Sequence, residues 1–211
     1  MTEKLPADFR SRSIGDYLSA LSSGSPTPGG GSAAGLAGAL GCSLGQMVCN
    51  LTLARGQQEA LVTLTERFAG IANELVTLAW RDEQAFAAYR AAIAIPRSTD
   101  EEKDARRAAI ERALVAAADV PLEMIDHGVA AIDCLRRTAE LGTPHALGDL
   151  MTGGWLLQAM SLGALENVEA NASSMKVPEN RERYKSAARI ARHNLDTNVS
   201  ALKQAVALKV N

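Results

Sequence analysis

Residues 25–56 read SPTPGGGSAAGLAGALGCSLGQMVCNLTLARG, the segment that says most about how this chain folds. From Ala33 to Ala54 it carries no formal charge, and its glycines recur at positions 35, 38, 41 and 45. Spacings of three and four place these glycines on one helical face, where another backbone can approach closely. At about 1.5 Å per residue the helix is long enough to span a bilayer. Its Ser, Gln, Asn and Thr side chains, and a mean hydropathy of −0.04 for the chain, favour a buried central helix instead.

The composition of the whole chain is typical of a helical protein. Of its 211 residues, 47% are hydrophobic and only 4% are aromatic, and much of the hydrophobic fraction is alanine, which favours helices over strands. The 24 acidic and 22 basic residues give a net charge of −2, without the basic surface that nucleic-acid binding usually needs. We therefore expect one all-α domain over residues 1–211, an up-and-down bundle of long helices around the Gly/Ala-rich one, with neither nucleic acid nor membrane as a partner.

The chemistry-bearing residue types give no sign of a disulfide framework or a metal site. The three cysteines form no C-x-x-C pair, and the three histidines are far apart in sequence, without a ligand spacing such as H-E-x-x-H. The N-terminal residues MTEKLPADFR are charged and lack the apolar core of a signal peptide. The cysteines are Cys42, Cys49 and Cys134, and the histidines are His127, His145 and His193. We expect a cytoplasmic protein that binds no metal.

Helix-breaking residues divide the chain into helices with short connections. Ser32 is the expected N-cap of the glycine-rich helix, and Pro96 ends the long helix that follows. Thr99-x-x-Glu102 is a capping-box pattern, and Pro121 fits the first turn of a further helix. The expected helices span residues 11–23, 32–54, 57–95, 99–119, 121–142, 145–176 and 178–208.

One carboxylate occupies an apolar position of the helix expected at 57–95. Apolar residues recur there three and four apart from Leu61 to Tyr89, and Asp82 falls on the same face. An ionised carboxylate on such a face costs several kcal/mol unless it is paired or lines a cavity. Asp82 is therefore either paired or close to the surface, or it is a functional group whose pKa is raised by its surroundings.

Two other features have both a functional and a packing interpretation. In the helix expected at 145–176, one face carries an acid at one end, two carboxamides at the other and glycines between, which suits a ligand or a close helix contact. Its members are Asp149, Gly153, Leu156, Met160, Gly163, Asn167 and Asn171. The turn Gly29–Gly30–Gly31 before Ser32 can bind an anion at a helix N-terminus or let two helices cross closely. The G-x-S-x-G match around Ser43 lies inside a helical pattern, so it is not a hydrolase nucleophile elbow.

Several motifs in register resemble the tetrahydrofolate cyclodeaminase/cyclohydrolase family. The segment at 25–56 is similar to the family's P-x-P-G-G-G-S signature and the small-residue helix after it, which ends near M-V-x-x-L-T. Further matches are DEQAFAAY (82–89), PRSTDEEK with DVPLEM (96–103 and 119–124) and ENVEAN (166–171). The resemblance extends over essentially the whole chain. Within the family, the chain looks most similar to the stand-alone bacterial methenyltetrahydrofolate cyclohydrolases.

The resemblance implies an all-helical homodimer that binds a folate in a cleft involving both subunits. The family's D-x-x-A-F motif carries an aspartate thought to accept a proton, and here that residue is Asp82. The family's G-N-x-x-x-x-S-D stretch matches in part: Asp149 is retained, whereas Thr143 and Gly148 replace the usual Asn and Ser.

On this basis we expect hydrolysis of 5,10-methenyltetrahydrofolate to 10-formyltetrahydrofolate, with no metal or redox cofactor. Asp82 would act as the base, and Asp149 would orient the water or pair with the folate nitrogens. The expected substrate-binding residues are Pro28, Gly29, Gly30, Gly31, Ser32, Asn167 and Asn171, the glycine turn either lining the cleft or receiving the glutamyl carboxylate. The alternatives are a formiminotetrahydrofolate cyclodeaminase, which releases ammonia, and a non-catalytic folate-binding or scaffold dimer.

Overall fold

Helices make up nearly all of the structure, a computed structural model that describes residues 7–56 and 58–210. No strand occurs in these residues, so the predicted all-α class is confirmed. The helices are α1 (Ala7–Ser11), α2 (Ile14–Leu21), α3 (Gly30–Leu53), α4 (Glu59–Ile93), α5 (Asp100–Leu141), α6 (Leu147–Ser174) and α7 (Pro178–Val210), with a short 3₁₀ turn at Pro144–Ala146 before α6.

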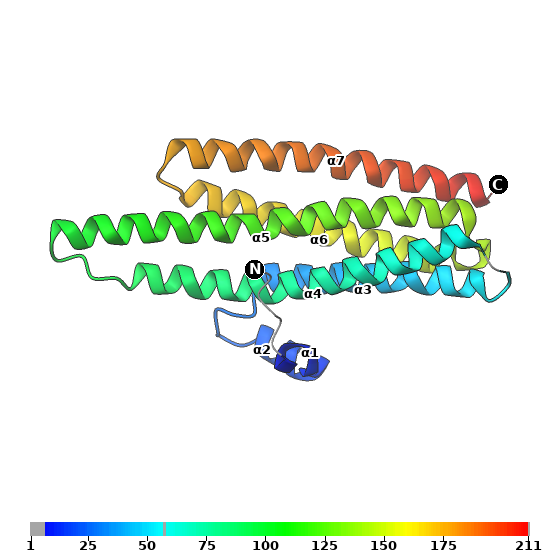
Figure 1. Cartoon of the computed structure of the whole chain (residues 1–211), viewed down its shortest axis with the longest axis horizontal. Helices are drawn as coiled ribbons and strands as arrows, with labels where there is room; N and C mark the ends of the chain where they lie inside the picture. The colour runs from blue at the N-terminus through cyan, green and yellow to red at the C-terminus, as the bar shows by residue number, and fades with distance from the viewer. Residues whose placement is uncertain (1–6, 57, 211) are drawn as a thin grey trace.

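The five long helices α3 to α7 run up and down along one axis (Figure 1). Each of them packs against the helix that follows it in the chain. In addition, α3 packs against α6, and α7 packs against α5. The apolar positions of α4 confirm the predicted face: Leu61, Leu64 and Phe68 are fully buried in the common core. Helices α1 and α2 lie to one side of this bundle (Figure 1).

The glycines of α3 let two neighbouring helices approach at backbone distance. A Cβ on Gly41 would lie 2.8 Å from the carbonyl oxygen of Gly153 in α6, and a Cβ on Gly153 would lie 2.9 Å from that of Gly41. On the α4 side, a Cβ on Gly35 would lie 2.9 Å from the carbonyl oxygen of Leu75. Of the described helices, only α3 is long and apolar enough to cross a membrane, and here it packs between α4 and α6.

Gly41→Ala is expected to destabilise the protein by about 1–3 kcal/mol, because the new methyl group would meet backbone that cannot rotate away. Gly70→Ala, in the middle of α4, is the matched control, since a Cβ there meets nothing within 4 Å. Alanine should stabilise that helix by about 0.5–1 kcal/mol. Thermal or urea unfolding of both variants measures the difference. Equal stability of the two variants would contradict the glycine-to-glycine packing.

The predicted break before Pro121 is wrong, because α5 continues through this proline. A proline inside a helix cannot donate to the carbonyl four residues earlier, which here is that of Ala117. The Asn171 side chain supplies the missing donor, with its Nδ2 2.9 Å from the Ala117 oxygen. A side chain from α6 thus satisfies the backbone of α5, and the helix reaches 42 residues.

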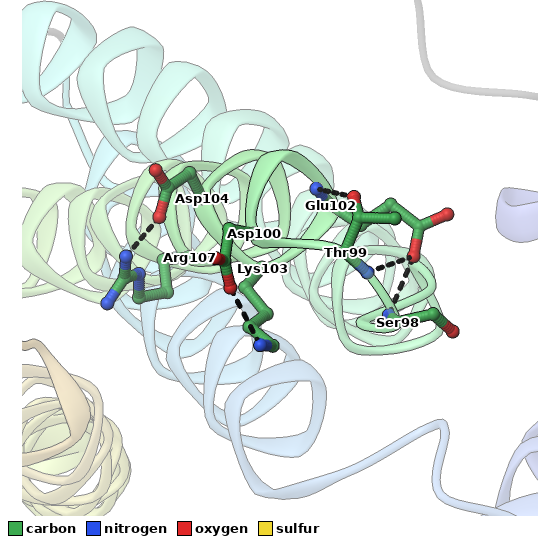
Figure 2. Close-up of polar contacts among 7 residues, drawn as sticks. All are labelled: Ser98, Thr99, Asp100, Glu102, Lys103, Asp104 and Arg107. Atoms are coloured by element: carbon green, nitrogen blue, oxygen red, sulfur yellow. Dashed lines mark hydrogen bonds and ion pairs between the residues drawn. The ribbon is translucent and has the colours of Figure 1, made fainter.

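The predicted helix ends are confirmed in part. Thr99 and Glu102 form the capping box at the start of α5: Glu102 N–H donates to the Thr99 hydroxyl at 3.2 Å, and the Glu102 carboxylate accepts from the Thr99 backbone (Figure 2). Ser32 is not the N-cap of α3, which begins at Gly30 with Gly29 as its cap. The helix predicted at 11–23 is shorter than expected: it is α2 (Ile14–Leu21), with Ser13 as its N-cap, and the separate helix α1 ends at Ser11. Gln57, the predicted first residue of the long helix, lies outside the described residues.

Candidate functional site

A cleft opens where α3 begins, because α3 is shorter than the helices it packs against. Its 24 residues extend about 36 Å, whereas the 35 residues of α4 and the 42 of α5 extend about 53 and 63 Å. Helix α3 therefore starts near the middle of the bundle, and α4, α5 and α6 continue beyond it (Figure 1). The loop before α3 meets these three helices around a cavity of about 310 Å³, at the lower end of the usual size for small-molecule sites.

Most of the predicted site residues line this one cleft. Gly29, Gly30 and Gly31 come from the loop and the first turn of α3, Asp82 from α4, and Asn167 and Asn171 from α6. Residues about 140 positions apart in the sequence are thus brought together by the antiparallel packing of α3 and α6. The remaining lining residues are Pro26, Thr27, Phe86, Tyr89, Leu114, Ala117, Ala170 and Ser174.

Asp82 lies against the first turn of α3. The N-cap residue Gly29 has no side chain to satisfy the free N–H groups at this helix end, and the Asp82 carboxylate accepts a hydrogen bond from the backbone N–H of Ser32. A carboxylate at a helix N-terminus is favoured by the helix dipole. A methyl group on Gly31 would overlap this carboxylate, 2.6 Å from Oδ2 and closer still to Oδ1 and Cγ, so the approach requires glycine.

The surroundings of Asp82 raise its pKa above the ordinary value for an aspartate. The side chain is half-buried, and desolvation is the largest cause of the raised pKa. The Ser32 hydrogen bond opposes this change, and the negative charge of Glu83 adds to it. The other cleft-lining residues, apart from the phenol of Tyr89, have no ionisable side chain. Asp82 is therefore a carboxylate with increased basicity, facing a largely uncharged cleft.

The two carboxamides differ in what they already bind. Asn167 Nδ2 donates to the Gly163 carbonyl oxygen in its own helix at 2.9 Å, and a Cβ on Gly30 would lie 4.0 Å from that nitrogen. Asn171 Nδ2 is held by the Ala117 carbonyl oxygen, as described above. In each residue one of the two amide N–H groups is used within the protein, which leaves the second N–H and the carbonyl oxygen to bind a ligand.

Pro28 and Ser32 lie behind the cleft rather than along it. Both are buried, and neither is among the residues that line the cavity. The Ser32 hydroxyl donates to Glu83 Oε1 at 2.9 Å and accepts from the Tyr17 hydroxyl at 3.1 Å. Because the Asp82 carboxylate already occupies the N-terminus of α3, a second anion such as a glutamyl carboxylate would be repelled there. Of the two roles expected for the glycine turn, lining the cleft is the one the geometry favours.

Asp149 is not in the cleft of the same chain. It is exposed in the first turn of α6, 18 residues before Asn167, which is about 27 Å along the helix axis. Of the residues that the sequence places on one face of α6, only those at the C-terminal end, Asn167 and Asn171, line the cleft. Within one chain, Asp149 cannot act together with Asp82.

Two aromatic residues of the cleft are not among the predicted site residues. Phe86 and Tyr89 follow Asp82 by one and two helical turns on α4, with ring centroids 6.3 Å apart and planes at 45°. The Phe86 side chain is 37% exposed, so its ring is open to a ligand. The helical spacing of D-x-x-x-F-x-x-Y would have found them, because positions i, i+4 and i+7 share one helical face.

The arrangement can remove a proton beside a flat, cationic ligand. Asp82 provides the base and the negative charge, the aromatic rings provide surfaces for stacking, and the amide oxygens accept hydrogen bonds. In the part of the chain that the structure describes, no group of three or more His, Cys, Asp or Glu side chains is placed to hold a metal ion. Ser43 lies in the middle of α3 and donates its hydroxyl to the Ala39 carbonyl oxygen at 2.9 Å, unlike a strained nucleophile.

Comparisons with known proteins agree with this geometry. The chain is 36% identical over 166 residues to the methenyltetrahydrofolate cyclohydrolase of Methylorubrum extorquens, covering 77% of this chain and 80% of that protein. It is 32% identical over 167 residues to the formimidoyltransferase-cyclodeaminase of Rattus norvegicus, where the match spans 77% of this chain but only 31% of the longer relative.

Structural comparison gives the same fold. The crystal structure of formiminotetrahydrofolate cyclodeaminase from Thermotoga maritima superposes with a TM-score of 0.82, covering 96% of this chain and 99% of that one at 22% identity. The sequence profile of the formiminotransferase-cyclodeaminase family matches residues 13–205, nearly the whole chain. Fold, sequence and the placement of the DEQAFAAY motif in the cleft lead to one conclusion: this chain belongs to the formiminotransferase-cyclodeaminase family.

Proposed function

We propose that this protein hydrolyses 5,10-methenyltetrahydrofolate to 10-formyltetrahydrofolate, with Asp82 as the general base. The observation that carries the proposal is the half-buried Asp82 carboxylate, with its raised pKa, in the wall of the cleft at the start of α3. The methenyl group is an amidinium-like cation, so a single carboxylate both attracts the substrate and accepts a proton from water. The cyclohydrolase relative, matched over 80% of its length, supports this reaction class.

The chemistry needs only groups that the cleft contains. Asp82 accepts a proton as the water oxygen bonds to the bridging carbon, which gives a neutral carbinolamine. The bond from that carbon to N5 then breaks, and its electron pair stays on N5, which takes the proton from Asp82. The hydroxyl of the carbinolamine loses its proton to solvent, and a formyl group remains on N10. One water is consumed and one proton is released, so no metal or redox cofactor is required.

A second candidate is a formiminotetrahydrofolate cyclodeaminase, in which N10 attacks the formimino carbon and ammonia leaves. The 32% identity to the rat bifunctional protein supports it, although the chain matches only 31% of that protein. The same base serves both reactions, so the cleft fits either substrate. The cyclohydrolase is preferred because the chain matches the cyclohydrolase relative at 36% identity and over 80% of that protein's length.

Loss of methenyl absorbance, measured against the spontaneous rate, tests the proposed reaction, and ammonia release from formimino-tetrahydrofolate tests the alternative. We expect turnover of the methenyl substrate. Turnover of the formimino substrate alone would replace the proposal with the second candidate. Failure of both substrates, together with tight binding of a folate analogue, would support the non-catalytic folate-binding protein.

We further propose that the protein is a homodimer and that the partner subunit's Asp149 completes the cleft. The outer face of α3 has no charged residue, and it exposes Leu40 (61%), Leu51 (47%) and Met47 (37%). An apolar face of this kind is typical of an interface between copies. If two α3 faces pack antiparallel about a twofold axis, the N-terminal end of the partner subunit's α6, which carries Asp149, is brought toward the cleft.

Mixing two inactive variants tests this arrangement. We expect Asp82→Asn and Asp149→Asn each to lose activity as pure dimers. If each site uses Asp82 of one subunit and Asp149 of the other, dissociating and reassociating the two variants should restore about a quarter of wild-type activity, because half of the dimers are mixed and half of their sites are intact. No recovery in a demonstrated mixed dimer, or a mass of 22.2 kDa for the native protein in solution, would contradict the shared site.

A further inference from the structure

Ser32 connects two adjacent carboxylates of α4 by two different groups. Its backbone N–H donates to the Asp82 carboxylate, and its hydroxyl donates to Glu83 Oε1 at 2.9 Å. Ser32 is fully buried in the first turn of α3, where its N–H group has no acceptor within the helix. The orientation of its hydroxyl therefore depends on Glu83, and the location of its N–H group sets the position of Asp82.

Helix α2 adds a third member to this chain of hydrogen bonds. The Tyr17 hydroxyl donates to the Ser32 hydroxyl at 3.1 Å, so the serine oxygen accepts one bond and donates another. The Arg12 guanidinium lies 4.0 Å from Glu83 Oε1, with the Glu83 side chain only 13% exposed. Burial is the largest cause of the raised pKa of Tyr17, and the charges of Glu83 and Asp82 contribute to it, so all three groups lie close together.

We propose that Tyr17 and Glu83 are positioning residues that act on the Asp82 carboxylate through Ser32. The proposal rests on the function assigned above to Asp82. Glu83 does not line the cleft and has a buried hydrogen-bond partner, so it is not a second base. Its place directly behind the N-terminus of α3 lets it hold Ser32, and through Ser32 the carboxylate that faces the ligand.

Charge gives Glu83 a second influence on the same group. The groups that face Asp82 are the Ser32 N–H and Glu83, with Tyr17 behind them, whereas the lining residues from α5 and α6 are uncharged. A negative neighbour disfavours ionisation of Asp82 and makes it a stronger base. Removing that charge should therefore lower the basicity of Asp82 as well as loosen Ser32.

Three conservative variants test the inference in the full-length protein. Ser32→Ala removes the hydroxyl and keeps the N–H, Tyr17→Phe removes one donor, and Glu83→Gln removes the charge while keeping an acceptor. Each should lower kcat by about three- to tenfold, as expected for one lost hydrogen bond, and change KM for the methenyl substrate by less than about twofold. In Glu83→Gln the acidic limb of the kcat/KM profile should also move to lower pH, because Asp82 loses its negative neighbour.

Coupling between the variants separates positioning from a merely structural role. If Glu83 positions Asp82 through Ser32, the kcat loss of the Ser32→Ala/Glu83→Gln double variant should be clearly smaller than the product of the two single losses, while the pH shift of Glu83→Gln should persist because it arises from charge. Glu74→Gln, an exposed glutamate on the same helix, is the control for charge removal and should leave the profile unchanged.

The result that overturns the inference differs from the result that overturns the function. Wild-type kcat and an unchanged pH profile in Tyr17→Phe and Glu83→Gln, with Asp82→Asn inactive, would remove the positioning role and leave Asp82 as the base. An active Asp82→Asn would remove the function itself. If Ser32→Ala does not fold, the two other single variants still decide the question, because both alter groups nearer the surface.

Discussion

Asp82→Asn is expected to lower kcat/KM for the methenyl substrate by about a thousandfold, within the range for loss of a general base. Asparagine keeps the size of the side chain and an oxygen that can accept the Ser32 N–H, but it cannot take a proton from water. The fold and the cleft should therefore remain. Stopped-flow absorbance of the methenyl group measures the rate, and fluorescence titration with a folate analogue measures binding.

The same substitution should stabilise the protein near neutral pH. Burial raises the pKa of Asp82 in the folded state, so the folded protein holds this proton more tightly than the unfolded chain does. The unfavourable contribution of the ionised group is absent below the ordinary aspartate pKa and grows as pH rises through the raised value. We expect Asp82→Asn to gain about 1 kcal/mol at neutral pH, or roughly 2–4 °C in Tm. The gain should disappear in acid.

The exposed Asp126 on α5 supplies the control, because Asp126→Asn changes the same chemical group outside the cleft. It should keep the wild-type rate. A wild-type rate in Asp82→Asn would mean that Asp82 only caps α3, and the base would have to be sought elsewhere.

Much of the fold is readable from the sequence because its signals are local. The spacing of Leu61, Leu64 and Phe68 shows which face of α4 is buried, and the Thr99 capping box marks the start of α5. Asp82 is noticeable because it interrupts that apolar face. The cleft arises there because α3 begins beside it, and the glycine turn marks that beginning.

The features that sequence analysis missed depend on contacts between distant segments. Pro121 has the local pattern of a helix start, and only the Asn171 side chain from α6 explains why α5 continues past it. Asp149 is an exception: it shares a helical face with Asn167, but their separation of 18 residues along one helix could have been converted to a distance from the sequence alone. About 27 Å of helix separates the two residues.

Gly31→Ala is expected to lower kcat/KM by about a hundredfold while leaving the protein folded. The added methyl group would take the space of the Asp82 carboxylate, which is the free end of a flexible side chain and can rotate away. Misplacement of a reacting group by about 1 Å can cost a factor of about a hundred in rate. Alanine also favours the helix, and Asp82 leaves its half-buried position, so Tm should not fall.

The double variant shows whether the loss at Gly31 occurs through Asp82. If it does, Gly31→Ala should change the rate of the Asp82→Asn protein very little, because groups that act as a unit are strongly non-additive. Gly70→Ala adds the same methyl group to a helix where it meets no neighbour, and it should keep the wild-type rate. Full activity in Gly31→Ala would mean that the carboxylate works from another position. Losses that multiply in the double variant would instead mean that Gly31 contacts the folate directly, as a lining residue with its own role in the reaction.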